Sequence, residues 1–111
     1  MRAARMSVVA AVAIIAVLVT ATVALAATRS VSVRKDGSRW LFSPRSLSIS
    51  KGDTVRWSWR GNAPHNVTGP GFASRTANRL TYSRRFNRTG TYRVRCTIHA
   101  DVGQRMTIRV R

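Results

Sequence analysis

The chain has 111 residues, of which 20 are Lys or Arg and three are Asp or Glu, and its formal net charge is +17. The single cysteine excludes a disulfide within the chain, and the absence of glutamate removes one of the usual general bases. A chain this basic is steered toward anionic partners. The other interpretation is a solvated arginine surface that only keeps the protein soluble.

An export signal is predicted at residues 1–27. Two arginines supply a basic start, and an uncharged apolar run covers residues 6–27. Small residues form a cleavage pattern, with the cut expected after Ala26 or Ala27. The run also approaches the roughly 20 apolar residues of a spanning helix, so an uncleaved membrane anchor is the alternative. Both interpretations predict an exported protein in the periplasm, outside the cell or in the cell envelope.

Residues 28–111 are expected to form one small all-β domain, which holds 18 of the basic residues and all three aspartates, a net charge of +15. Apolar and polar residues alternate in short runs between turns, and no helical period is sustained. The expected strands cover residues 31–34, 40–42, 46–50, 54–60, 80–84, 92–96 and 106–110. About seven or eight strands at this spacing indicate a two-sheet sandwich or barrel. Residues 69–78 show neither period and are predicted to form a surface loop.

The only cysteine stands at the end of a predicted strand. Tyr92, Val94 and Cys96 alternate with arginines, and His99 follows in a short loop. The other histidine, His65, lies far away in sequence after another strand. A thiolate and two imidazoles are the ligands of trigonal copper electron-transfer sites and, less distinctively, of zinc. The alternative is a free buried thiol with two unrelated histidines.

These residues lie within motifs that resemble the cupredoxin family, small blue-copper proteins of the plastocyanin, pseudoazurin and amicyanin type. The resemblance covers nearly all of residues 28–111, and the motifs are specific in combination, whereas the C-x-x-H spacing alone is weak. The matching segments are Phe42-Ser43-Pro44, Leu47-Ser48-Ile49, Lys51-Gly52-Asp53-Thr54-Val55-Arg56-Trp57, Pro64-His65-Asn66-Val67, Gly90-Thr91-Tyr92 and Cys96-Thr97-Ile98-His99.

The resemblance implies a Greek-key β-sandwich that holds one type 1 copper ion and carries single electrons between redox partners, without being an enzyme. His65, Cys96 and His99 would be the equatorial ligands. His99 would also be the partly exposed edge through which electrons pass. A β scaffold that clamps three ligands keeps nearly the same geometry in both oxidation states, so rigidity would be the functional property.

The same resemblance assigns supporting roles next to the ligands. Asn66 would tie its loop to the loop that carries Cys96, and Pro64 and Thr97 would flank the ligands. The family usually adds a weak axial methionine shortly after the second histidine. An alignment on the short-loop members puts Val102 at this position, and a valine side chain cannot ligate a metal.

Met106 is the only methionine near the axial position. Its strand phase, inward with Ile108 and Val110, favours core packing, and methionine often fills gaps in cores. Axial ligation by Met106 is the alternative. With Val102 in the slot, the site would be near trigonal and a stronger oxidant than a methionine-bearing relative. A backbone carbonyl near Ala63 would be a further way to cap the site.

The leading prediction is a monomeric, exported blue-copper electron carrier whose arginine surface docks an acidic redox partner or an anionic membrane or wall surface. A copper-binding or delivery module and a basic binder of anionic polymers on the same scaffold are the alternatives. Export disfavours nucleic acid as a specific partner. A hydrolase that pairs Cys96 with His99 ranks last, because the chain has no glutamate and no evident oxyanion hole.

Overall fold

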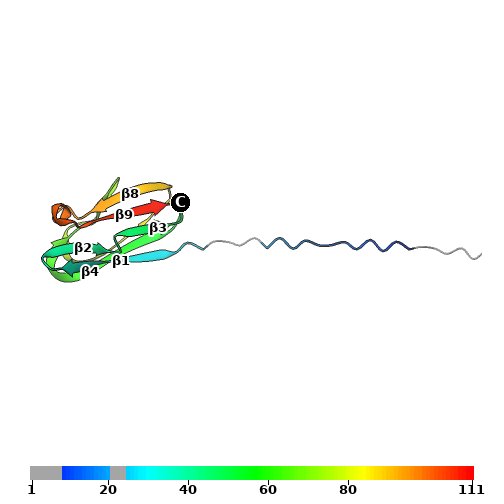
Figure 1. Cartoon of the computed structure of the whole chain (residues 1–111), viewed down its shortest axis with the longest axis horizontal. Helices are drawn as coiled ribbons and strands as arrows, with labels where there is room; N and C mark the ends of the chain where they lie inside the picture. The colour runs from blue at the N-terminus through cyan, green and yellow to red at the C-terminus, as the bar shows by residue number, and fades with distance from the viewer. Residues whose placement is uncertain (1–8, 21–24) are drawn as a thin grey trace, which may run out of the picture.

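The computed structural model describes residues 9–20 and 25–111 (Figure 1). The predicted export signal therefore lies partly outside the described residues. Its described part, residues 9–20 and 25–27, is exposed and forms no regular secondary structure. Across the described ranges, no helix combines the length and the apolar character that crossing a membrane requires.

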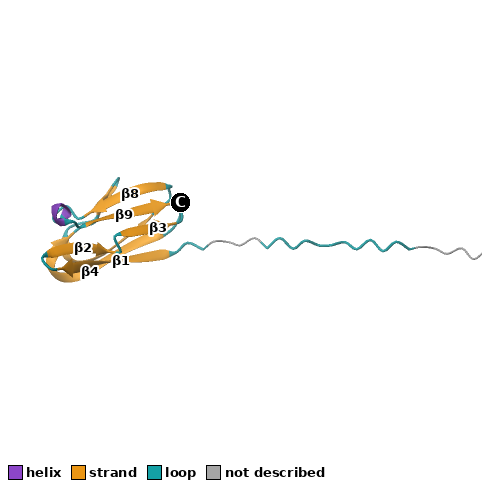
Figure 2. Ribbon diagram, in the orientation of Figure 1, coloured by secondary structure: helices purple, strands orange, loops and turns teal. Residues whose placement is uncertain are grey.

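Two packed β-sheets form the domain (Figure 2). The first sheet has the strand order β2-β1-β4-β7. β1 pairs antiparallel with β2 and parallel with β4, and β4 pairs antiparallel with β7. The strands of this sheet are β1 (Thr28–Asp36), β2 (Arg39–Ser43), β4 (Thr54–His65) and β7 (Ala77–Arg85).

The second sheet has the order β3-β9-β8-β5-β6, in which only β3 and β9 are parallel. Its strands are β3 (Ser46–Ile49), β5 (Thr68–Gly69), β6 (Phe72–Ala73), β8 (Gly90–Arg95) and β9 (Arg105–Val110). A single 3₁₀ turn, η1 (Ala100–Val102), lies between β8 and β9, and the described residues contain no α-helix. The predicted all-β, two-sheet sandwich is confirmed.

The strand count and two boundaries differ from the prediction. The described residues contain nine strands, because the stretch 69–78 holds most of the β5–β6 hairpin and the start of β7. A loop was expected there, and strands of two residues are too short to show an alternation. β4 also continues beyond Arg60 to His65, with a register shift between these two residues. The sequence predicted that this strand ends at Arg60, just before the residues over which the register of the ladder shifts.

Apolar side chains from both sheets fill the space between them. Trp57 and Trp59, two residues apart on β4, are 0% and 6% exposed and are therefore core residues. Trp40 on β2 is only half-buried. The buried hydrophobic residues are Val31, Phe42, Leu47, Ile49, Val55, Trp57, Trp59, Val67, Phe72, Phe86, Val94, Cys96, Met106, Ile108 and Val110.

Strand ends at one edge of the sandwich position the candidate ligands. β4 ends at His65, and β8 ends directly before Cys96. Arg95, the last residue of β8, lies opposite Arg105, the first residue of β9. The two ends of the loop between them are therefore side by side. Gly103 ends η1 with a φ of 96°, a left-handed conformation that glycine adopts without a side-chain clash. The antiparallel β8–β9 pair thus holds both ends of the Cys96 loop.

Candidate metal centre

The structure brings together the three residues that the sequence singled out. His65, Cys96 and His99 each offer a ligand atom, and these atoms all lie within 4.8 Å of one another. Cys96 Sγ lies 3.6 Å from His99 Nδ1. Cys96 is 0% exposed and His65 3%, whereas His99 is half-buried. Two segments about 30 residues apart thus meet at one closed cluster with a single partly open edge.

Backbone hydrogen bonds fix the loop that carries Cys96 and His99. The Cys96 N–H donates to the Gln104 carbonyl over 3.0 Å and closes the loop at its base. Inside the loop, the His99 carbonyl accepts from the N–H groups of Val102 and Gln104, both over 3.1 Å. The loop therefore satisfies much of its own backbone, which fixes the positions of the thiol and the imidazole.

Gln104 completes the cluster, although the sequence analysis did not name it. Its Oε1 atom lies 3.1 Å from His65 Nδ1 and 3.0 Å from His99 Nδ1. The side chain is 0% exposed, and its Nε2 atom is buried without a hydrogen-bond partner. Because a carbonyl oxygen only accepts, both Nδ1 atoms are the donors in this arrangement. Gln104 therefore presents an oxygen donor to the same point at which the two imidazoles converge.

A signal for Gln104 was present in the sequence. Gln104 shares the strand phase of Met106, Ile108 and Val110, all of which are buried. A polar residue at an inward position must find a partner or serve a site. The signal was missed because a methionine sulfur and a backbone carbonyl were the only donors considered for the axial position, although a glutamine oxygen is also a known axial ligand.

The two residues first considered for the axial position have other environments. Met106 is 3% exposed within the core, and its Sδ atom accepts a hydrogen bond from Trp57 Nε1–H over 3.2 Å. Val102 lies in η1 and is 44% exposed. Neither position offers what Gln104 offers, a buried polar atom within hydrogen-bond distance of both histidines.

Asn66 links the loop after β4 to the loop after β8. Its Nδ2 donates to Thr97 Oγ1 over 2.7 Å, and its Oδ1 accepts from the Thr97 N–H over 3.1 Å. Further bonds join Asn66 to Thr76 and Thr68. Pro64, in contrast, is exposed just before His65. The paired bonds between Asn66 and Thr97 bring the residue after His65 against the residue after Cys96.

Aromatic rings cover the histidine side of the cluster. Trp40 lies with its ring centroid 4.9 Å from that of His65 and 6.4 Å from that of His99. Trp59 contacts His65 edge-on at 6.1 Å, and the two imidazole centroids are 5.0 Å apart. Burial lowers the pKa of His65, an effect that its hydrogen bond with Gln104 opposes. The neutral imidazole, which is the form that binds metal ions, is therefore favoured.

A two-sheet β-sandwich with a His-Cys-His cluster between its strand ends defines a cupredoxin with a copper-type site. Residues 29–111 match the family model of copper binding proteins, plastocyanin/azurin family, and the chain belongs to this family. The resemblance drawn from the sequence is thereby confirmed. The family comprises electron carriers rather than enzymes, and the chain is related to plastocyanin, amicyanin and pseudoazurin.

Individual relatives agree with this assignment. Plastocyanin from Prochlorothrix hollandica is 33% identical over 105 residues, which covers 84% of this chain and 80% of the relative. Oxidised plastocyanin from Dryopteris crassirhizoma superimposes with a TM-score of 0.62 at 20% identity, over 74% of this chain and 99% of that one. Pseudoazurin from Methylobacterium extorquens AM1 gives a TM-score of 0.62 at 18% identity, over 75% and 74% of the chains. These structural matches show the shared fold.

Proposed function

We propose that this chain is an exported protein that carries single electrons through one copper ion bound by His65, Cys96 and His99. The observation that carries the proposal is the convergence of one thiol and two imidazoles within 4.8 Å at the edge of a packed sandwich. This donor set fits a type 1 copper ion, because soft thiolate and imidazole ligands suit copper in both oxidation states. A bound copper ion would supply the one-electron couple.

The protein's part in electron transfer is to keep the donor atoms still. Hydrogen bonds close the Cys96 loop onto Gln104, and Asn66 joins the two ligand-bearing segments. Because these bonds come from the protein itself, the scaffold would hold the ligands in nearly one geometry. Little rearrangement then accompanies a change of oxidation state, which favours rapid transfer.

Gln104 Oε1 is the proposed fourth, weaker donor. Its distances of 3.1 Å to His65 Nδ1 and 3.0 Å to His99 Nδ1 bring the oxygen close to both candidate ligand atoms. For metal binding, His65 and His99 must give up the Nδ1 hydrogens that they donate to Gln104. The neutral rings then carry these hydrogens on Nε2. An amide oxygen is harder than a thioether and stabilises Cu(II), so we propose a lower potential than that of a methionine-ligated relative.

His99 is the proposed electron entry and exit point. It is the only one of the three ligands that is not fully buried, and its exposed neighbours Ile98 and Val102 are each 44% exposed. An apolar rim around a ligand edge lets a partner approach closely and exclude water. A copper-delivery module would need an exchangeable site, and the burial of Cys96 and His65 favours a resident ion instead.

Adding Cu(II) to the purified protein tests the proposal. The intense thiolate-to-copper absorption should appear with one equivalent of copper and should be reversibly bleached by a reductant. Cys96→Ser should abolish the band. Met106→Leu is the matched control, because Met106 is buried nearby but hydrogen-bonds to Trp57, and this variant should keep the band. A wild-type protein that takes up copper without the thiolate band would contradict the proposal.

A further inference from the structure

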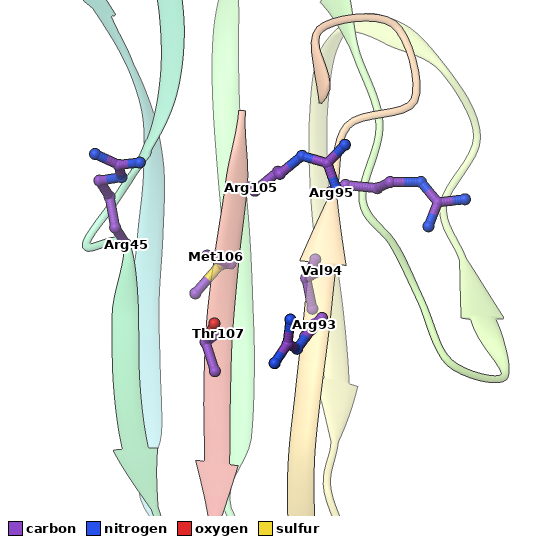
Figure 3. Close-up of a pocket in the computed structure, with 7 residues that line it drawn as sticks. All are labelled: Arg45, Arg93, Val94, Arg95, Arg105, Met106 and Thr107. Atoms are coloured by element: carbon purple, nitrogen blue, oxygen red, sulfur yellow. The ribbon is translucent and has the colours of Figure 1, made fainter. Parts of the chain in front are cut away.

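A pocket of about 270 Å³ opens on the β3-β9-β8 side of the molecule (Figure 3). Arg45 approaches from the segment before β3, Arg93 and Arg95 come from β8, and Arg105 comes from β9. The remaining lining residues are Val94, Met106 and Thr107. Four arginines thus contribute to the lining of one recess, and the side chain of Arg95 extends from it past β8 (Figure 3).

These arginines are not neutralised within the described part of the chain. The only ion pair found there joins Arg39 to Asp36 on the other sheet. Arg95 lies directly opposite Arg105 in the β8–β9 ladder, and like charges at such positions repel each other. Arg105 is also held in place, since its Nε–H donates to the Ala100 carbonyl over 2.9 Å. An anion in the pocket would relieve this repulsion and accept the donors of the guanidinium groups.

The pocket adjoins the metal centre through the chain itself. Arg95 directly precedes Cys96, and Arg105 directly follows Gln104. The backbone bond from the Cys96 N–H to the Gln104 carbonyl joins the same two strand ends. A group seated among these arginines would therefore lie next to the thiol ligand's own strand.

We propose that this arginine pocket docks a carboxylate-rich segment of an acidic redox partner protein. The proposal rests on the proposed electron-carrier function. Guanidinium forks match carboxylates in shape and hydrogen-bond donors, and four arginines line this recess. The net charge of +15 on residues 28–111 would accelerate the encounter with such a partner. The pocket would then set the orientation of the partner against β8 and β9, the strands on either side of the loop that carries Cys96 and His99.

A short oligoglutamate peptide is the probe for this site. Its affinity should be measured by titration calorimetry with the double variant Arg95→Gln, Arg105→Gln. The matched control is Arg56→Gln, Arg79→Gln, which removes the same charge from exposed positions on β4 and β7. We expect the pocket variant to bind about tenfold more weakly and the control to change by less than about twofold. Backbone amide NMR should place the peptide against β8 and β9.

Equal losses in the two double variants would overturn the proposal, because they would show only a general charge effect. It would also be overturned if wild-type protein failed to bind the peptide, or if anionic lipid vesicles bound through the pocket while the peptide did not. Copper absorption should be recorded for every variant. An absent band in wild-type protein would reject the carrier function, whereas a normal band with unselective peptide binding would reject only the docking site.

A separate observation concerns Asp53 and the start of the domain. Asp53 Oδ1 accepts a hydrogen bond from the Ala27 N–H over 2.9 Å, and Oδ2 accepts from the Ser50 N–H over 2.9 Å. The Thr54 N–H donates to the Ala27 carbonyl, also over 2.9 Å. Asp53 is 8% exposed, and these backbone bonds, that of Ala27 first, lower the pKa of its carboxyl group. Ala27 is thus held on both sides just before β1, while Leu25 is 88% exposed.

We infer that Asp53 is the receptor for the α-ammonium group that cleavage of the export signal after Ala26 would create. The inference rests on the proposed export signal. Hydrolysis of the Ala26–Ala27 bond consumes one water and leaves a carboxylate on Ala26 and an amine, protonated at neutral pH, on Ala27. This ammonium nitrogen would take the place of the amide nitrogen beside Asp53 Oδ1 as a charge-assisted donor. A cut after Ala27 would instead leave Asp53 Oδ1 and the Thr54 N–H without these partners.

The full chain, exported by a bacterial host, tests this inference. Intact mass and N-terminal sequencing should show a product that begins with Ala27. Its α-amino pKa should lie above the usual value of about 8, because the ion pair favours the charged form. Arg29 on β1 and Arg85 on β7 also face this region and oppose the rise in part. Asp53→Asn should return the pKa to its usual range, and Asp101→Asn should leave it raised.

A product that begins at Thr28, or one that begins at Ala27 with an ordinary α-amino pKa, would overturn the inference. A product that keeps its signal would also do so. The N-terminal residue and the α-amino pKa of the wild-type product test the inference even if Asp53→Asn fails to fold.

Discussion

Replacing Gln104 with methionine separates two roles of one buried side chain. Glutamine and methionine are both unbranched and of similar length, so the surrounding core is retained. The variant loses the oxygen that accepts from His65 and His99, and it gains a thioether at the same position. The consequences differ for the metal-free and the copper-loaded protein, which makes the substitution informative in both states.

The effect on the metal-free protein follows from three buried atoms. Two hydrogen bonds of 3.1 and 3.0 Å are lost, and each contributes about 0.5–1.5 kcal/mol. The variant also lacks the unpaired Nε2 atom, and removing this buried polar group raises the free energy of unfolding by about 1 kcal/mol or more. We therefore expect the free energy of unfolding to fall by about 1 kcal/mol. The midpoint of urea unfolding, followed by circular dichroism, measures this change.

The copper-loaded variant should show a higher potential, because a soft thioether favours Cu(I) more than an amide oxygen does. A tenfold shift in relative affinity corresponds to about 59 mV for a one-electron couple, and we expect a rise of at least about that size. Cyclic voltammetry measures the potential, and the visible and electron paramagnetic resonance spectra report the change of ligand. Unchanged spectra and potential in Gln104→Met would refute the assignment of Gln104 as the fourth donor.

Further variants probe the surroundings of the site. Met106→Leu should leave the potential unchanged but lower stability by about 1–3 kcal/mol, because the buried Trp57 N–H loses its acceptor; a shifted potential would instead make Met106 a ligand. Val102→Met should change the potential little, since Val102 is 44% exposed in η1; voltammetry checks this. Asn66→Ala should lower stability by about 2 kcal/mol or more and speed copper loss to a chelator, because it breaks the bonds to the Cys96 loop; unchanged loss rates would contradict the linking role. Asp53 contributes stability above the ordinary carboxyl pKa of 3.8 that is lost as the pH falls through its lower folded value; urea midpoints of wild type and Asp53→Asn should therefore converge in acid.

Residue types and strand phase predicted the candidate metal ligands that lie near each other in the sequence. Alternation up to Cys96 and the nearby His99 gave two members of the cluster, and the family resemblance supplied His65 from a distant segment. The inward strand phase of Gln104 was visible in the sequence, but its contacts with both histidines were not, because His65 and His99 meet only in the fold. The β5–β6 hairpin was missed for a different reason, since its strands hold two residues each and show no period.

The burial of Cys96 has a consequence for the order of assembly. A sulfur atom in a 0% exposed residue cannot reach a second chain, so the folded protein should not be lost to intermolecular disulfides in an oxidising compartment. Gln104 meanwhile holds the imidazoles at their binding positions. We therefore expect the metal-free protein to be a durable intermediate rather than a damaged product, able to take up copper after the chain has folded. Supply of the ion and synthesis of the polypeptide need not coincide in time or in place.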